Sequence, residues 1–181
     1  ILVLQTNLLT IQLSLIAVSL AAIYPFTKRW TSLPQFVLGA AFGMSIPMAF
    51  AAQTGTIAIE AGLIFIGSVV WTLIYDTLYA MADREEDLKI GVKSTAILFK
   101  KYDQIIITFL QLLLILIFFG IGNTFNLGQI YYFSLIIIGC IMIYHQFLMK
   151  KRQNDQYFKA FIHNNYIGMT AFAGIFLSVT I

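Results

Sequence analysis

Residues Ile105 to Gly120 read IIITFLQLLLILIFFG, a stretch without a charged side chain. A backbone amide in hydrocarbon has no water to bond, so only helices and closed β-barrels span a membrane. A barrel strand would alternate lipid-facing and lumen-facing residues with a period of two, and this stretch does not. The stretch therefore predicts a transmembrane α-helix and an all-α fold class.

The composition of the 181 residues agrees with burial in lipid, because 60% are hydrophobic and only 10% are charged. Soluble domains have about half apolar and about a quarter charged residues. A helix needs about 20 apolar residues to cross the hydrocarbon, and Cys140, the single cysteine, is expected to be a buried packing residue. Hydropathy predicts a transmembrane bundle with spans at about residues 8–23, 33–51, 57–80, 105–121, 130–149 and 160–181.

The basic residues predict the orientation of these spans. All 11 Lys and Arg residues fall within residues 24–32, 81–103 and 150–159, which are alternate connections of the bundle. Because cytoplasmic loops carry an excess of Lys and Arg, these three connections are predicted to be cytoplasmic. The net charge of +3 is then an orientation signal, and no nucleic-acid partner is expected.

An acidic segment follows the third predicted span. If that helix continues at about 100° per residue, Asp76, Asp83 and Asp87 fall within about 40° of one another, with Tyr79 beside them. Aligned carboxylates repel each other unless a cation lies between them, and oxygen-only ligation suits Mg²⁺. The segment predicts a Mg²⁺ site. Asp76 is a functional candidate in its own right, because an ionisable residue at the membrane boundary is costly.

A basic and aromatic motif, YPFTKR at residues 24–29, ends the first span. Tyr24 and Lys28 are four residues apart and are able to present a hydroxyl and an ammonium to an anion, although Pro25 makes a regular helix uncertain. An interface anchor is the alternative interpretation of this motif. For the acidic segment the alternative is a solvated loop with local ion pairs.

Together the two segments resemble the intramembrane aromatic prenyltransferases of the UbiA superfamily, and within it the branch that acts on 4-hydroxybenzoate. The resemblance covers about residues 24–102, and the later spans match only in hydropathy. It rests on the strings YPFxKR from Tyr24, LPQ from Leu33, SIPMAF from Ser45, YDTxYAM from Tyr75, DRxxD from Asp83 and GxKS from Gly91.

The resemblance implies a nine-helix bundle in which two Asp-rich motifs face each other and hold Mg²⁺ against a polyprenyl diphosphate. It implies roles for eight positions: Asp83 and Asp87 as metal ligands, Asp76 and Lys28 as catalytic residues, and Tyr24, Lys28, Arg29, Tyr79 and Lys93 as substrate-binding residues. The implied reaction joins the polyprenyl group to the carbon of 4-hydroxybenzoate ortho to its hydroxyl, in ubiquinone biosynthesis. The expected location is the bacterial inner membrane, in contact with its lipid, with the active site facing the cytoplasm.

Only the second Asp-rich motif occurs in the printed sequence. The sequence also opens at Ile1 in an apolar stretch, without an initiator Met or the basic region of a signal peptide. We therefore expect residues 1–181 to be one membrane-embedded domain that lacks its N-terminal helices and first motif, and that is inactive alone. Two alternatives stay open: another aromatic acceptor, such as a naphthoate, homogentisate, haem or chlorophyll precursor, and a membrane transporter subunit.

Overall fold

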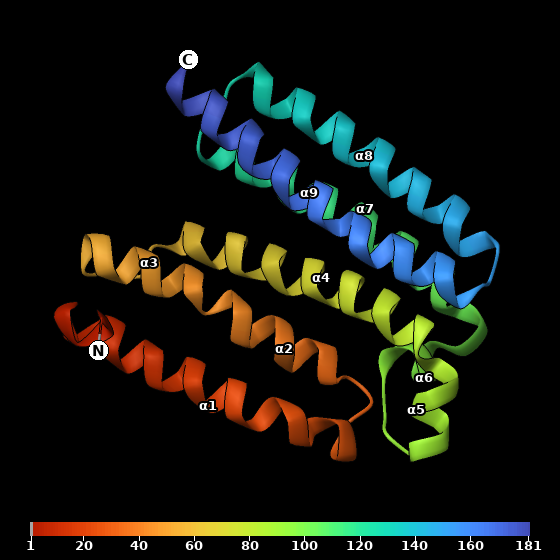
Figure 1. Ribbon diagram of the computed structural model, residues 1–181. Coiled ribbons are helices and arrows are strands. Elements are labelled where there is room, and N and C mark those ends of the chain that lie inside the picture. Colours follow the sequence, from red (N-terminus) through yellow and green to blue (C-terminus); the bar gives the residue numbers. More distant parts are fainter. Residues whose placement is uncertain (1) are drawn as a thin grey trace.

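The computed structural model describes residues 2–181, which are mostly helical and contain no strand (Figure 1). The elements in chain order are η1 (Leu2–Gln5), α1 (Leu8–Trp30), α2 (Pro34–Gly43), α3 (Ser45–Thr54), α4 (Ile59–Ala82), α5 (Arg84–Ile90), α6 (Thr95–Phe99), η2 (Lys100–Tyr102), α7 (Asp103–Thr124), α8 (Gln129–Lys150) and α9 (Asn154–Thr180). The all-α prediction is confirmed.

The long helix α4 lies at the centre of the bundle. In Figure 1, α1 and the α2–α3 pair lie on one side of α4, and α7, α8 and α9 lie on the other. Ile74 and Leu78 of α4 are fully buried, as are Leu114 of α7 and Ile138 of α8, so the main apolar core runs between these helices. The short helices α5 and α6 lie at the end of the bundle where α4 finishes, and α5 carries Glu85, Glu86 and Asp87.

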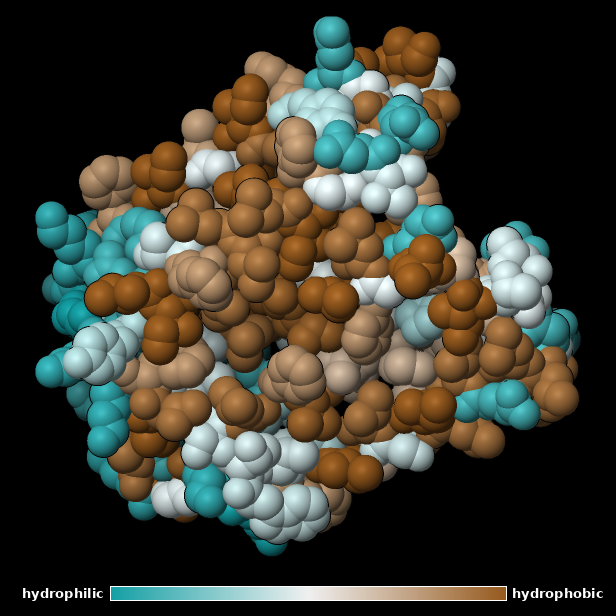
Figure 2. Space-filling model, turned by 180° about the vertical axis from the view of Figure 1, so that it is seen from behind, coloured by the Kyte–Doolittle hydropathy of each residue, from teal (hydrophilic) through white to brown (hydrophobic). Residues whose placement is uncertain are grey.

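Within residues 2–181, five segments are long and apolar enough to cross a membrane: Leu8–Trp30, Pro34–Thr54, Ile59–Ala82, Thr95–Thr124 and Gln129–Lys150. The sixth predicted span falls in α9, which has 27 residues but is more polar. The face in Figure 2 is covered by hydrophobic side chains across its middle, with hydrophilic ones along the left edge and in smaller groups at the top and right. This distribution belongs to an integral membrane protein.

The second predicted span is interrupted at Met44, which separates α2 from α3. Pro47 accounts for the break, because a proline has no N–H to donate to the carbonyl four residues earlier. Upstream of the break, a Cβ on Gly39 would lie 3.1 Å from the Cα and the carbonyl oxygen of Val69. The glycine therefore lets α2 approach the backbone of α4 closely.

The prediction of one continuous helix through Asp76, Asp83 and Asp87 is wrong. Helix α4 ends at Ala82 and α5 begins at Arg84, with Asp83 between them at φ −94° and ψ 5°. The Asp83 N–H donates to the carbonyl of Tyr79 and so closes α4, while the Asp83 carbonyl accepts from the N–H of Asp87 at 2.9 Å and opens α5. Asp83 thus serves both helix ends, and the three carboxylates do not share one helical face.

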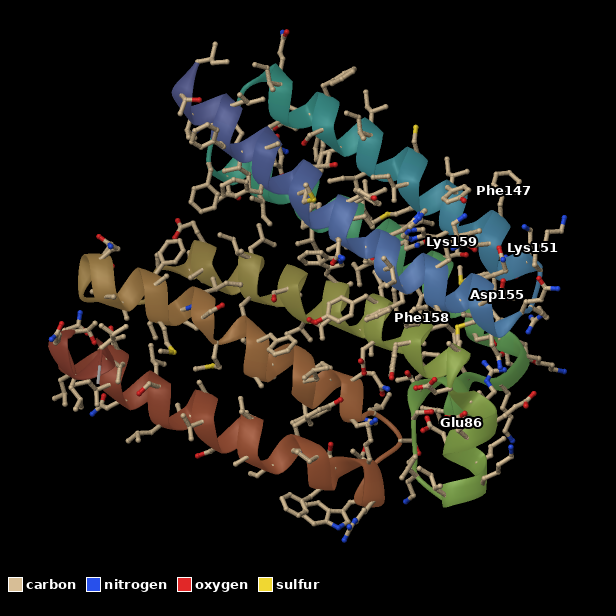
Figure 3. All side chains as sticks on the ribbon, viewed as in Figure 1. Glu86, Phe147, Lys151, Asp155, Phe158 and Lys159 are labelled. Atoms are coloured by element: carbon tan, nitrogen blue, oxygen red, sulfur yellow. The ribbon has the colours of Figure 1, made fainter. Side chains whose placement is uncertain are left out.

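The basic connections all lie at one end of the bundle, as the charge pattern predicts. The α1–α2 connection, α5 and the α8–α9 connection meet at the right of Figure 1. Figure 3 shows Glu86, Lys151, Asp155 and Lys159 at this same end. The charged end and the apolar middle therefore occupy separate levels along the helix axes.

Candidate functional site

The candidate site lies at the charged end of the bundle, where three segments distant in the sequence converge. Helix α1 contributes Lys28, α4 contributes Asp76, and α5 with the residue before it contributes Asp83 and Asp87. Helix α1 continues through Pro25 as far as Trp30, so Lys28 stands on regular helix. The fold thus unites the two motifs that the sequence analysis treated separately.

The connection after α5 is fastened to α1. The backbone N–H of Lys93 donates to the carbonyl of Lys28 at 2.9 Å, and the Lys93 Nζ donates to the carbonyl of Trp30 at 3.2 Å. Cationic side chains commonly bond the last carbonyls of a helix in this way. The Lys93 ammonium is therefore bound to the last residue of α1.

Helix α6 is fastened to α2 and α4 in the same region. The Thr95 N–H donates to the Gln35 Oε1 at 3.3 Å, and the hydroxyls of Thr77 and Thr95 lie 2.7 Å apart. Gln35, Thr77 and Thr95 are all buried. These bonds fix the connection that carries Asp87 relative to the spanning helices.

Lys28 lies close enough to two carboxylates of the site to influence both. Its positive charge acts on both Asp76 and Asp87, and Gln35 also approaches Asp76 within hydrogen-bonding reach. An ammonium placed among carboxylates offsets their mutual repulsion. Lys28 is therefore positioned to neutralise negative charge brought to this end of the bundle.

Burial raises the pKa of the Asp87 carboxyl above its ordinary value, and the charges of Asp83 and Glu86 raise it further, whereas Lys28 and a hydrogen bond from Ser94 oppose the rise. The ionised form of Asp87 is thus disfavoured by burial and by its acidic neighbours. A cation bound between Asp83 and Asp87 would reverse this effect, because an opposite charge nearby favours a carboxylate. Asp83 and Asp87 could therefore supply two of the oxygen ligands that a cation site needs.

Aromatic side chains form a wall between α4 and α9 beside the carboxylates. The ring of Phe161 lies 6.2 Å from Tyr75 and 5.1 Å from Tyr79, measured between centroids. A cavity of about 360 Å³ next to this wall is lined in part by Trp71, Tyr75 and Asn164. The Trp71 Nε1 and the Asn164 Oδ1 are buried and have no hydrogen-bond partner among the described residues.

The model of the UbiA prenyltransferase family matches residues 1–176. The chain belongs to the UbiA prenyltransferase family. A solved structure of a UbiA homologue from Aeropyrum pernix K1 has the same fold, with a TM-score of 0.82 at 21% identity, over 98% of this chain and 66% of that one.

Two curated UbiA relatives carry the name 4-hydroxybenzoate octaprenyltransferase. The protein from Vesicomyosocius okutanii is 59% identical over 98% of this chain and 65% of its own length. The protein from Photobacterium profundum is 51% identical over 99% of this chain and 62% of its own length. The chain thus spans a little under two thirds of the length of these relatives.

Prenyltransferases of the UbiA family generally depend on a divalent metal. Among residues 2–181 no group of three or more His, Cys, Asp or Glu side chains is placed to hold a metal ion. Mg²⁺ in proteins is typically bound by one or two carboxylates together with substrate phosphates and water. Asp83 and Asp87 fit that smaller donor set.

The remaining predicted residues differ in their surroundings. Tyr24 lies near Asp76, and Tyr79 lies near Asp76, Asp83 and Asp87, so both face the candidate site. Arg29 is exposed near the end of α1 and makes no salt bridge within the described residues.

Gln35 and Ser94 approach the site carboxylates Asp76 and Asp87, and neither residue was predicted to belong to the site. The sequence around Gln35 does indicate that this residue is unusual. It directly follows Pro34 at the start of a predicted span, where a polar residue is unusual, and its string belongs to the family resemblance. Ser94 stands just before α6 and accepts a bond from the Ile97 N–H at 3.4 Å, as helix-capping serines do.

Proposed function

We propose that the protein to which these residues belong transfers a polyprenyl group from a polyprenyl diphosphate to 4-hydroxybenzoate, at the carbon ortho to the hydroxyl, in ubiquinone biosynthesis. The convergence of Lys28 with Asp76, Asp83 and Asp87 at one end of an apolar bundle supports this proposal most strongly. The names of the curated relatives support the choice of acceptor. They favour 4-hydroxybenzoate over the other aromatic acceptors.

In this proposal Asp83 and Asp87 hold Mg²⁺, and Tyr24 and Lys28 contact the diphosphate. The bound metal supplies positive charge that neutralises the leaving diphosphate. Lys28 adds a fixed cation to the same leaving group, and fixed charges aimed at developing charge are an effective means of catalysis. Departure of the diphosphate leaves an allylic carbocation at the end of the isoprenoid chain.

The acceptor ring attacks this carbocation through the carbon ortho to its hydroxyl, and loss of the proton from that carbon restores aromaticity. We place the ring in the cavity beside Tyr75, with Asp76 stabilising the cation or receiving the proton. Arg29 binds the acceptor carboxylate, because a guanidinium suits a planar acceptor. The apolar walls exclude water that would otherwise quench the cation.

We also propose that residues 1–181 form part of a single domain in the bacterial inner membrane, with the site facing the cytoplasm. The basic connections at the site end support this orientation. The printed sequence contains one Asp-rich motif, so in this proposal a second carboxylate motif elsewhere in the protein completes the site. Gathering of charge at one end also argues against a transporter, which would need polar groups deeper in the bundle.

The experiment is Mg²⁺-dependent transfer of a radiolabelled prenyl group to 4-hydroxybenzoate by the full-length protein in membranes. We expect Asp83→Ala to reduce transfer on the order of 100-fold, as the loss of charge stabilisation at a reacting group does. Glu85→Ala is the matched control, because Glu85 is a neighbouring exposed carboxylate and should leave transfer unchanged.

Equal activity of the two variants would contradict the metal role of Asp83. No transfer to 4-hydroxybenzoate by well-expressed wild type would contradict the proposed acceptor and direct the assay to other aromatic acceptors. Failure with every aromatic acceptor would contradict prenyl transfer itself and favour the transporter.

A further inference from the structure

A second cavity at the charged end of the bundle is lined by basic side chains and lies beside a different face of α5. Its volume is about 390 Å³. Arg84 and Leu88 of α5 line this cavity, whereas Asp83 and Asp87 belong to the candidate site. Asp87 and Leu88 are consecutive residues of α5, so their side chains leave the helix about 100° apart. We call the cavity the basic pocket; its lining is Arg84, Leu88, Ala96, Ile97, Lys100, Lys101 and Arg152.

The charge of the basic pocket is suited to an anion. Four of its lining residues are cationic and none is acidic. Asp103, the carboxylate that pairs with Arg84 and Arg152, is fully buried. One carboxylate does not neutralise four cations, so the pocket retains an excess of positive charge.

Two further features of the residues that line the pocket are unusual. The Arg84 Nε is buried and has no hydrogen-bond partner among the described residues, which leaves a charged donor unsatisfied. Lys100 and Arg152 have φ values of +50° and +51°. Residues other than glycine rarely adopt such a conformation, and it is concentrated at functional sites.

The position of the pocket favours a lipid over a soluble anion. Lys100 and Lys101 come just before α7, and Arg152 follows α8, so the cations stand where two helices enter the membrane. The Lys101 Nζ lies 5.2 Å from the centre of the Tyr102 ring, and tyrosines gather at membrane interfaces. Leu88, Ala96 and Ile97 give the pocket an apolar wall that a free phosphate would not contact.

We propose that the basic pocket binds the phosphate of an anionic phospholipid headgroup, with the glycerol and upper acyl chain against the apolar wall. Basic pockets between transmembrane helices are known to hold acidic lipid headgroups. The site is separate from the proposed catalytic residues and requires no turnover to be detected.

The test is native mass spectrometry of the full-length protein in detergent, titrated with phosphatidylglycerol or phosphatidylcholine. The variant is Lys100→Gln with Lys101→Gln. The matched control is Lys89→Gln with Lys150→Gln, which removes the same charge from exposed residues at the same end that do not line the pocket. Because all four lysines are exposed, we expect the thermal midpoint without lipid to be unchanged in both.

We expect phosphatidylglycerol to bind wild type more tightly than phosphatidylcholine does. Each lysine near a lipid headgroup is worth about fivefold in affinity, so the pocket variant should lose about 25-fold, and the control should lose less than about twofold. Equal losses in the two variants, or equal affinity for the two lipids, would overturn the proposal. If millimolar inorganic phosphate displaced phosphatidylglycerol, the proposal of a lipid ligand would be overturned, and the pocket would be assigned to free phosphate.

Discussion

Asp76 differs from the other two site carboxylates because it stands within a spanning helix. It lies six residues before the end of α4 and is only partly exposed. Its neighbours are the ammonium of Lys28 and the carboxamide of Gln35. Ionisable residues at such positions are costly, and those present usually have a function. Its separation from the helix break at Asp83 suits a role toward the reacting carbon and not toward the metal.

Replacing Asp76 by Asn tests this separation of roles, because the substitution keeps the shape of the side chain and removes its charge. We expect kcat to fall on the order of 100-fold, as for loss of a general base, while the KM for the polyprenyl diphosphate changes little. Steady-state prenyl transfer measures both. Glu60→Gln, at the opposite end of the same helix, is the control. Unchanged turnover in Asp76→Asn would remove Asp76 from the mechanism.

The residues of the site were predictable to different degrees. Asp83 and Asp87, four residues apart, form a pattern that is visible locally. Gln35 was not predictable from spacing, because the bond that joins it to Thr95 spans 60 positions of the sequence. The same holds for the bond between Lys93 and Trp30. Contacts of this kind depend on how helices pack, which hydropathy does not determine.

Helix α5 depends on the glycine that ends it. Gly91 has φ +73°, and its N–H donates to the carbonyl of Asp87. A Cβ on Gly91 would contact nothing within 4 Å. Any cost of a side chain at this position is therefore a backbone cost, and a left-handed conformation costs a residue with a Cβ about 1–2 kcal/mol.

We expect Gly91→Ala to loosen the end of α5 by about 1 kcal/mol and to raise the KM for the diphosphate, since Asp87 lies in the last turn. Limited proteolysis of residues 84–94 should become faster. Gly62→Ala is the matched control, because a Cβ there also contacts nothing within 4 Å, and its position inside α4 should make alanine neutral or stabilising. Equal proteolysis rates for the two variants would refute the conformational argument.

The helices were predictable as spans but not as continuous elements. Length and apolar content identify α4, α7 and α8 within a few residues, whereas α1 continues seven residues beyond the predicted end of the first span. Hydropathy does not record where a helix breaks, and the break at Met44 falls inside the predicted span 33–51. The break at Asp83 lies just beyond the predicted span 57–80, where helical periodicity alone was extended too far. Hydropathy also does not tell which side of a helix faces the rest of the bundle. The prediction that Cys140 is buried was wrong for this reason, because Cys140 is exposed on α8.

On the scale of the molecule, the alternation of basic and uncharged connections predicted that all the basic connections share one end. It did not predict how that end is joined together. Asp103, the first residue of α7, is fully buried and pairs with Arg84 of α5 at 2.5 Å and with Arg152 of the α8–α9 connection at 3.6 Å. One carboxylate thus connects three segments of the charged end, including the helix that carries Asp87.

The two arginines should contribute unequally to this connection. The Arg84 side chain is 26% exposed and makes the short contact, whereas Arg152 is 49% exposed and lies farther away. Arg84→Gln leaves a buried carboxylate with only the distant partner, so we expect a loss of about 3 kcal/mol in the free energy of unfolding. Arg152→Gln removes a solvated partner and should cost less than about 1 kcal/mol. Denaturant unfolding in detergent measures both. Equal losses would mean that Asp103 depends on its two partners alike, and that the α8–α9 connection holds the charged end as firmly as α5 does.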